Sequence, residues 1–127
     1  MGARARGPRS RSKSEERTVL VVEDDEDLLG TYELWLAGCE DVAVRTALDG
    51  EAALAAVDDD VDALVLDRRL PALSGPEVLN RLDGDRPVVV VSAYQPDAHV
   101  CEDDVTAYLV KPVTRERFLD AVRRALL

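Results

Sequence analysis

The sequence is poor in cysteine, histidine, lysine and aromatic residues. Its 127 residues include two cysteines, Cys39 and Cys101, and one histidine, too few for a zinc site or a disulfide-stabilised fold. No apolar run approaches the roughly 20 residues that cross a bilayer, and the longest, around Val88–Val91, has the length of a strand. These shortages predict a cytoplasmic protein with no membrane segment, and the chain length allows one domain of ordinary size.

Charge is abundant but unbalanced. Aspartate and glutamate together number 26 against 16 basic residues, which gives a net charge of −10. Lysine occurs only as Lys13 and Lys111. An acidic, lysine-poor surface suits a halophilic protein kept soluble in strong salt, where screening reduces the repulsion between like charges. A GC-rich genome would also favour arginine over lysine.

Residues 1–17 differ from the rest of the chain. They carry five arginines and Lys13 against two glutamates, and no apolar side chain larger than alanine follows Met1. Such a segment cannot bury enough surface to fold, so we expect a disordered basic tail. It lacks the apolar stretch of a signal peptide. A nucleic-acid-binding or partner-binding arm and a plain solvated tail both fit, and the folded domain is expected at 18–127.

From Thr18 onward, short β-branched runs alternate with helical patterns. Five strands alternating with helices predict an α/β domain whose parallel sheet is covered on both faces. Between Ser92 and Thr106 the pattern supports at most a short helix. The expected strands are Thr18–Val22, Val42–Thr46, Ala63–Leu66, Val88–Val91 and Ala107–Val110. The expected helices are one that carries Leu28, Tyr32, Trp35 and Leu36 and stops at Gly38, Gly50–Val57 capped by Asp49, Gly75–Leu82, and a last one capped by Thr114.

Polar residues follow four of the expected strands. Glu23 and Asp24 come after the first strand, Asp67 after the third, Ser92 after the fourth and Lys111 after the fifth. Ligands of open α/β sheets bind outside the carboxyl ends of the strands, so these side chains are expected at one edge. Three carboxylates brought together repel unless a cation lies among them, and hard oxygen ligands suit Mg²⁺.

The same residues fit phosphoryl chemistry. A carboxylate can attack phosphorus and form an aspartyl phosphate. The transferred group then needs its charge neutralised, which a metal ion, Lys111 and the Ser92 hydroxyl would share. Each residue alone would be read as a polar side chain that ends a strand. Together they predict a Mg²⁺-dependent phosphoryl-transfer site.

This ordered set of motifs resembles the receiver domain of two-component response regulators from Thr18 to Leu127. The resemblance is closest to the haloarchaeal receivers that precede a HalX domain. It implies a flavodoxin-like (CheY-like) doubly wound α/β fold, a five-stranded parallel sheet in the order 2-1-3-4-5. The motifs are Glu23-Asp24-Asp25, Asp67-Arg68-Arg69-Leu70-Pro71, Gly75, Ser92-Ala93, Tyr108 and Lys111-Pro112.

The resemblance also implies roles for the acidic residues. Asp67 would be the phospho-acceptor, which takes a phosphoryl group from a phosphohistidine on a sensor histidine kinase. Asp24 would ligate Mg²⁺ directly and Glu23 through water, together with Asp67 and the backbone carbonyl of Arg69. The side chains of Arg68 and Arg69 would screen the carboxylates or contact a partner, or form a solvated pair.

Three further residues would carry the response. Ser92 would move toward the phosphoryl group and Lys111 would bind its charge, while the Lys111-Pro112 bond matches a cis peptide of the family. Tyr108 matches the switch aromatic, although a half-buried strand tyrosine explains it equally simply. The signal would pass to an output domain or a second receiver through the family's fourth helix, fifth strand and fifth helix. Short spacings on either side of Ser92 predict abbreviated third and fourth helices.

Two other functional classes compete with this interpretation. A pseudo-receiver would be an interaction module without phosphorylation, but it normally lacks one of the site residues that are present here. A haloacid-dehalogenase-type phosphatase needs a second carboxylate two residues after its nucleophile, where this chain has Arg69.

A receiver is not an enzyme beyond its own phosphorylation and dephosphorylation. Direct nucleic-acid binding by the acidic domain is not expected. No HalX or winged-helix segment follows Leu127, so a stand-alone receiver and part of a longer protein both remain open.

Overall fold

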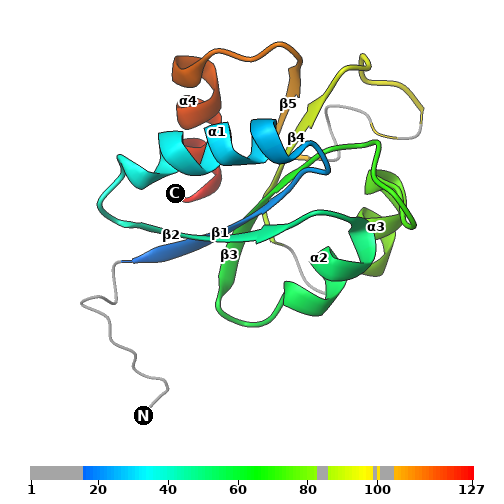
Figure 1. The fold of residues 1–127 in the computed structure, drawn as a ribbon, viewed down its shortest axis with the longest axis horizontal. Coiled ribbons are helices and arrows are strands. Elements are labelled where there is room, and N and C mark those ends of the chain that lie inside the picture. The colour runs from blue at the N-terminus through cyan, green and yellow to red at the C-terminus, as the bar shows by residue number, and fades with distance from the viewer. Residues whose placement is uncertain (1–15, 83–85, 99, 101–104) are drawn as a thin grey trace.

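The computed structural model describes residues 16–82, 86–98, 100 and 105–127. All five strands of this part form one parallel sheet in the order β2-β1-β3-β4-β5 (Figure 1). This order is the one that the sequence analysis expected, and it confirms the doubly wound α/β fold. The strands are β1 (Arg17–Val22), β2 (Val42–Ala47), β3 (Val61–Leu66), β4 (Val88–Ser92) and β5 (Ala107–Val110).

The helices lie in two layers, with α1 and α4 on one face of the sheet and α2 and α3 on the other (Figure 1). Each begins at a residue whose side chain accepts a backbone N–H of the first turn, which replaces a missing intrahelical partner. The helices are α1 (Glu26–Ala37), α2 (Gly50–Ala56), α3 (Gly75–Arg81) and α4 (Arg115–Ala125), capped by Asp25, Asp49, Ser74 and Thr114.

Alternate residues of the central strands enter two separate cores. In β1, Val19 and Val21 pack beneath α1 and α4, whereas Leu20 and Val22 pack against α2 and α3. All four are essentially inaccessible to solvent. Because side chains alternate across a sheet, a strand covered on both faces must be apolar at every position, which explains the unbroken apolar runs.

Three aromatic residues join α1 to α4. The rings of Tyr32 and Phe118 stack with centroids 4.5 Å apart, and Trp35 lies against both at 5.7 and 5.5 Å. Tyr32 is buried, and burial raises the pKa of its phenol to about 12. This cluster fixes the C-terminal helix to the helix that follows the first acidic motif.

Four of the five strands are one or two residues longer than the sequence analysis expected. Arg17, assigned there to the tail, is the first residue of β1, because its N–H donates to the carbonyl oxygen of Asp41 at 2.8 Å and extends the pairing with β2. The described residues between β4 and β5 form no helix, which agrees with the expectation of at most a short one. Among the described residues, the expected partner face therefore has β5 and α4 as its regular elements. The rest of the predicted tail, residues 1–15, and Cys101 lie outside the described residues.

Among the described residues, no helix combines the length and the apolar character needed to span a membrane.

Candidate functional site

Four strands deliver polar side chains to one edge of the sheet. The pairing continues one residue past the strands: the N–H of Glu23 donates to Ala47 O at 3.1 Å, and that of Asp67 to Val22 O at 3.1 Å. The N–H of Lys111 donates to the carbonyl oxygen of Ser92 at 2.8 Å. These bonds hold the backbone of each expected site residue in register with its neighbours, so their side chains leave the sheet at the same end.

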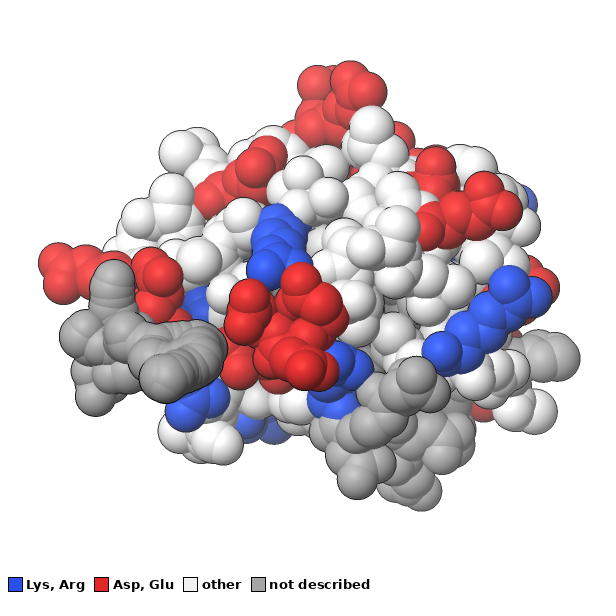
Figure 2. Space-filling model, turned by 90° about the horizontal axis from the view of Figure 1, so that it is seen from below, with Lys and Arg blue, Asp and Glu red and all other residues white. Residues whose placement is uncertain are grey.

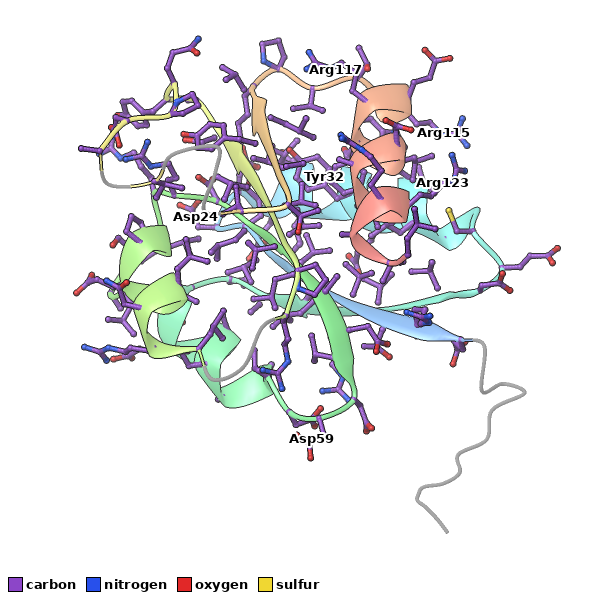
Figure 3. The ribbon with its side chains drawn as sticks, turned by 180° about the vertical axis from the view of Figure 1, so that it is seen from behind. Asp24, Tyr32, Asp59, Arg115, Arg117 and Arg123 are labelled. Carbon is purple, nitrogen blue, oxygen red and sulfur yellow. The ribbon has the colours of Figure 1, made fainter. Side chains whose placement is uncertain are left out.

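Three carboxylates meet at this edge. Glu23, Asp24 and Asp67 each offer one oxygen, and the three oxygens lie within 4.8 Å of one another. Glu23 and Asp67 are 2 % and 6 % exposed, whereas Asp24 is open to solvent. Figure 3 shows Asp24 at this edge, well away from Asp59 at the opposite end of the sheet.

Lys111 bridges the two buried carboxylates. Its Nζ donates to Oε1 of Glu23 and to Oδ2 of Asp67, both at 2.9 Å. Burial on its own would lower the pKa of Lys111, but the hydrogen bonds to Asp67 and Glu23 outweigh that effect and raise it. The only lysine of the described residues is therefore a permanent positive charge between two acids. The following Lys111-Pro112 bond is cis, as the resemblance implied.

Glu23, one of the two buried acids, keeps its proton to an unusually high pH. Burial, reinforced by the charge of Asp67, raises the pKa of Glu23 to about 7, against the opposing hydrogen bonds from Lys111 and from the N–H of Asp25. A carboxylate in low dielectric beside another carboxylate is costly to ionise. The pocket thus carries more negative charge than Lys111 alone compensates.

The donor set of this pocket fits a hard divalent cation. Glu23, Asp24 and Asp67 provide carboxylate oxygens, which Mg²⁺ prefers, and the exposed Asp24 leaves room for the waters that Mg²⁺ retains. The N–H of Arg69 donates to Oδ1 of Asp67 at 3.0 Å, so the residue that bears the expected carbonyl ligand is held next to the acceptor.

Two glycines fix the segment after Asp67. A Cβ on Gly75 would lie 2.5 Å from the carbonyl oxygen of Asp67, and one on Gly50 would lie 2.3 Å from that of Leu73. The N–H of Gly75 also donates to Arg68 O at 2.8 Å. Only glycine permits this approach, so the first residues of α3 and α2 press directly on the acceptor segment.

Ser92 and Tyr108 lie on neighbouring strands. Ser92 is fully buried, and its Oγ accepts the N–H of Tyr94 at 3.0 Å, which leaves its own proton free to be donated. The hydroxyl of Tyr108 donates to the carbonyl oxygen of Tyr94 at 2.7 Å. Tyr108 therefore contacts the residues after β4 and not the carboxylate cluster itself.

Both arginines after Asp67 are engaged, an arrangement that the sequence analysis missed. Arg69 lies over the ring of Tyr94, 5.5 Å from its centroid, and contacts the Tyr94 hydroxyl. Arg68 bonds Tyr108, Gln95 and Asp97. The consecutive arginines beside the acceptor were a signal, but apart from Tyr108 on β5 their partners lie in the segment after β4, which has no regular sequence pattern.

The sequence from residue 19 to residue 123 matches the family model described as the response regulator receiver domain. The match covers most of the chain and agrees with the sheet order and with the acidic pocket. The chain therefore belongs to the receiver domain family of response regulators.

Individual relatives agree with this assignment. A Haloferax volcanii protein, named as a candidate transcriptional regulator, is 42% identical over 118 residues, covering 91% of this chain and 20% of that protein. The transcriptional regulatory protein PrrA of Mycobacterium tuberculosis is 41% identical over 117 residues, 85% of this chain and 49% of PrrA. The chain thus spans half or less of the length of these relatives.

Among solved structures, the chemotaxis response regulator CheY4 of Vibrio cholerae has the same fold. Its TM-score is 0.77 at 24% identity, with 87% of this chain and 99% of CheY4 covered. Taken together, the chain is a receiver domain with an acidic pocket, formed by Glu23, Asp24 and Asp67, of the kind typical of phosphoacceptor receivers. Such domains interact with histidine kinases and are typically not enzymes apart from their own phosphorylation.

Proposed function

We propose that this receiver accepts a phosphoryl group on Asp67 from the phosphohistidine of a sensor histidine kinase, and then changes conformation to signal to an output domain or a second receiver. The observation that carries this proposal is the pocket itself. Three carboxylates share it with Lys111, which bonds both Glu23 and Asp67. A buried acid with a positive charge already beside it suits a group that must receive phosphate.

The transfer is a displacement at phosphorus. A carboxylate oxygen of Asp67 forms the new bond while the P–N bond to the donor histidine breaks, and the imidazole leaves with the electron pair and takes up a proton. Glu23, Asp24, Asp67 and the Arg69 carbonyl would hold Mg²⁺. That ion, when bound, supplies positive charge beside the phosphoryl oxygens.

The remaining charge is met by groups of the chain. The ammonium of Lys111 is 2.9 Å from Asp67, so its charge is in place before the reaction and no reorganisation is needed. The bond from Tyr94 uses the Ser92 oxygen as acceptor and does not occupy the hydroxyl proton, which would donate to a phosphoryl oxygen. Phosphorylation adds a charge of about −1.5 to −2 and three acceptor oxygens, which Lys111 and Ser92 would bind.

The test is the intact mass after incubation with Mg²⁺ and acetyl phosphate in high salt. We expect the wild-type chain to gain one phosphoryl group, about 80 Da, and Asp67→Asn to gain none. Asp59→Asn is the matched control, since Asp59 is exposed and lies at the other end of the sheet (Figure 3), and it should be labelled like the wild type.

Two outcomes would contradict the proposal. Stoichiometric labelling of Asp67→Asn would remove Asp67 from the acceptor role. No labelling of the wild type, with Mg²⁺ shown to bind, would favour a pseudo-receiver that acts only through interactions. A phosphatase of the haloacid dehalogenase type has less support, because Arg69 cannot act as its second acid and instead packs on Tyr94.

A further inference from the structure

Arg68 connects three parts of the chain that the proposed switch uses. Its side chain is 11% exposed, and its guanidinium donates to the hydroxyl of Tyr108 at 3.0 Å and to the carbonyl oxygen of Gln95 at 3.1 Å. It also donates to both carboxylate oxygens of Asp97, at 3.1 and 3.2 Å. One planar group therefore holds β5 and the segment after β4 to the residue next to Asp67.

The backbone of Arg68 offers little freedom. Its carbonyl oxygen accepts the N–H of Gly75 at 2.8 Å, and a Cβ on Gly75 would lie 2.7 Å from the Cα of Arg68. Arg68 thus starts from a rigid base packed against the first turn of α3. The segment from Tyr94 to Asp97 cannot move away from the acceptor without breaking bonds to its guanidinium.

The hydroxyl of Tyr108 both donates and accepts a hydrogen bond in this arrangement. It donates to Tyr94 O at 2.7 Å and accepts from Arg68 at 3.0 Å. A guanidinium stays protonated and can only donate, so the direction of both bonds is determined. The tyrosine is held at its polar end by one charged donor and one backbone acceptor.

The network continues toward the pocket. Tyr94, whose carbonyl oxygen binds Tyr108, donates its N–H to Oγ of Ser92 at 3.0 Å. Arg68 is therefore linked to Ser92 through Tyr108 and Tyr94, and to Asp67 through the backbone. Asp97 closes the other end, where its Oδ1 also accepts the N–H of Val100 at 3.3 Å.

We propose that Arg68 is a positioning residue of this receiver: its guanidinium holds the Tyr108 hydroxyl and the segment Tyr94–Asp97 in one arrangement, and so couples phosphorylation of Asp67 to Tyr108. The inference rests on the proposed function. Arg68 does not touch the acceptor oxygens in this role. Without the Arg68 guanidinium, the Tyr108 hydroxyl keeps only its bond to the carbonyl oxygen of Tyr94. Phosphorylation of Asp67 then no longer changes the environment of Tyr108.

The experiment follows Tyr108 by fluorine NMR of protein containing 3-fluorotyrosine. The chain has three tyrosines, so the Tyr108 signal is assigned from its loss in Tyr108→Phe. Spectra are recorded with Mg²⁺, before and after acetyl phosphate, and labelling of Asp67 is measured by mass on the same samples. In the wild type, the Tyr108 signal should shift when Asp67 is labelled.

In Arg68→Ala, labelling of Asp67 should persist while the shift of the Tyr108 signal falls by at least half. Arg81→Ala is the matched control, because it removes the same charge from an exposed side chain in the last turn of α3 that is not among the partners of Arg68. Its Tyr108 shift should stay near that of the wild type. Arg68→Lys keeps the charge but cannot serve Tyr108, Gln95 and Asp97 together, so it should restore less than half of the lost shift.

The two proposals fail differently. A labelled Arg68→Ala protein with a wild-type Tyr108 shift would overturn the role of Arg68 and leave the proposed function intact. An equal loss in Arg81→Ala would overturn it too, because the effect would then follow charge and not position. A wild type without label would overturn both proposals. If Arg68→Ala does not fold, Arg68→Lys carries the test, and a full wild-type shift in that variant contradicts the inference.

Discussion

The buried carboxyl of Glu23 shows how residues in the pocket depend on one another. Its oxygens are engaged on two sides, Oε1 by the ammonium of Lys111 and Oε2 by the N–H of Asp25 at 3.2 Å. Even so, burial and the neighbouring Asp67 raise its pKa to about 7. A cation that enters the pocket must therefore compete with a proton near neutral pH.

This competition predicts a pH-dependent affinity for Mg²⁺. Binding of a metal requires the ionised carboxylate and releases any proton on it, so affinity rises with pH up to the pKa of Glu23 and then levels off. For one proton and a pKa near 7, Mg²⁺ should bind about tenfold more weakly at pH 6 than at pH 8. Calorimetric titrations at both values measure this, and Glu23→Gln should remove the dependence. Equal wild-type affinities would contradict the expectation.

Removal of the bridging charge should destabilise the metal-free protein. In Lys111→Met, Glu23 and Asp67 lose their shared donor, which should lower the free energy of unfolding by about 1–3 kcal/mol at pH 8. The folded-state pKa of Glu23 lies above its usual 4.5. The folded state therefore binds more protons than the unfolded state between 4.5 and about 7, and stability falls as pH rises through that window.

Without Lys111, stability should fall more as the pH rises, because the hydrogen bond from Lys111 that lowers the pKa of Glu23 is lost. Urea unfolding of Lys111→Met and the wild type at pH 5.5 and pH 8 gives the comparison. The two proteins should differ less at the lower pH, where Glu23 is protonated. A difference that does not change with pH would mean that packing of the lysine side chain dominates over its charge.

At the scale of the elements, close backbone approach decides where the acceptor segment lies. The N-terminus of α3 reaches Asp67 and Arg68 only because Gly75 has no side chain, and the capping box of Ser74 and Glu77 stabilises that end. The Ser74 Oγ accepts the Glu77 N–H, and the Glu77 carboxylate accepts the N–H of Ser74. The seven-residue helix is thus defined at its first turn.

Gly75→Ala should lower the free energy of unfolding by about 1–3 kcal/mol, because the new methyl group would overlap the carbonyl oxygen of Asp67. Gly30→Ala is the matched control. Gly30 is an exposed residue within α1, and a Cβ there meets nothing within 4 Å. That change should raise the free energy of unfolding by about 0.5–1 kcal/mol through helix propensity. Thermal unfolding of both variants measures the two changes. A shift of both stabilities in the same direction would contradict the expectation.

On the scale of the whole molecule, an excess of negative charge surrounds an apolar interior. Figure 2 shows acidic side chains gathered at the centre of one face with basic ones beside them. Some of these charges pair, such as Arg45 with Asp58 at 3.1 Å and with Asp60 at 3.7 Å. Exposed pairs of this kind contribute little, and the net charge of −10 remains.

Salt should therefore stabilise the fold by screening. The melting temperature should rise by several degrees between about 0.02 and 0.5 M KCl, over which the screening length falls from about 20 Å to a few ångströms. Most of the gain should occur below about 0.5 M, since screening is nearly complete there. Differential scanning calorimetry across the series is the measurement. A flat profile below that concentration, followed by a rise in multimolar salt, would contradict screening as the cause.

Much of the architecture follows from local patterns. Short β-branched apolar runs such as Val88–Val91 favour strands covered on both faces, and the polar residue after each run marks the edge where a ligand binds. The caps Asp49 and Thr114 were predictable because their side chains act within the first turn of the helix. The acidic pocket was predictable because each of its residues directly follows an expected strand, and the carboxyl ends of parallel strands lie at one edge of a sheet.

What the sequence by itself determined is the set of strands, their parallel arrangement and the group of Glu23, Asp24, Asp67 and Lys111 at one edge. Tertiary structure alone decided that Lys111 bridges two buried acids, that burial raises the pKa of Glu23, and that Arg68 reaches Tyr108, 40 residues away in the chain. The physical reason is the distance along the chain over which each interaction acts. Strand and cap patterns depend on near neighbours, whereas desolvation and a shared hydrogen bond depend on which distant segments the packing brings together.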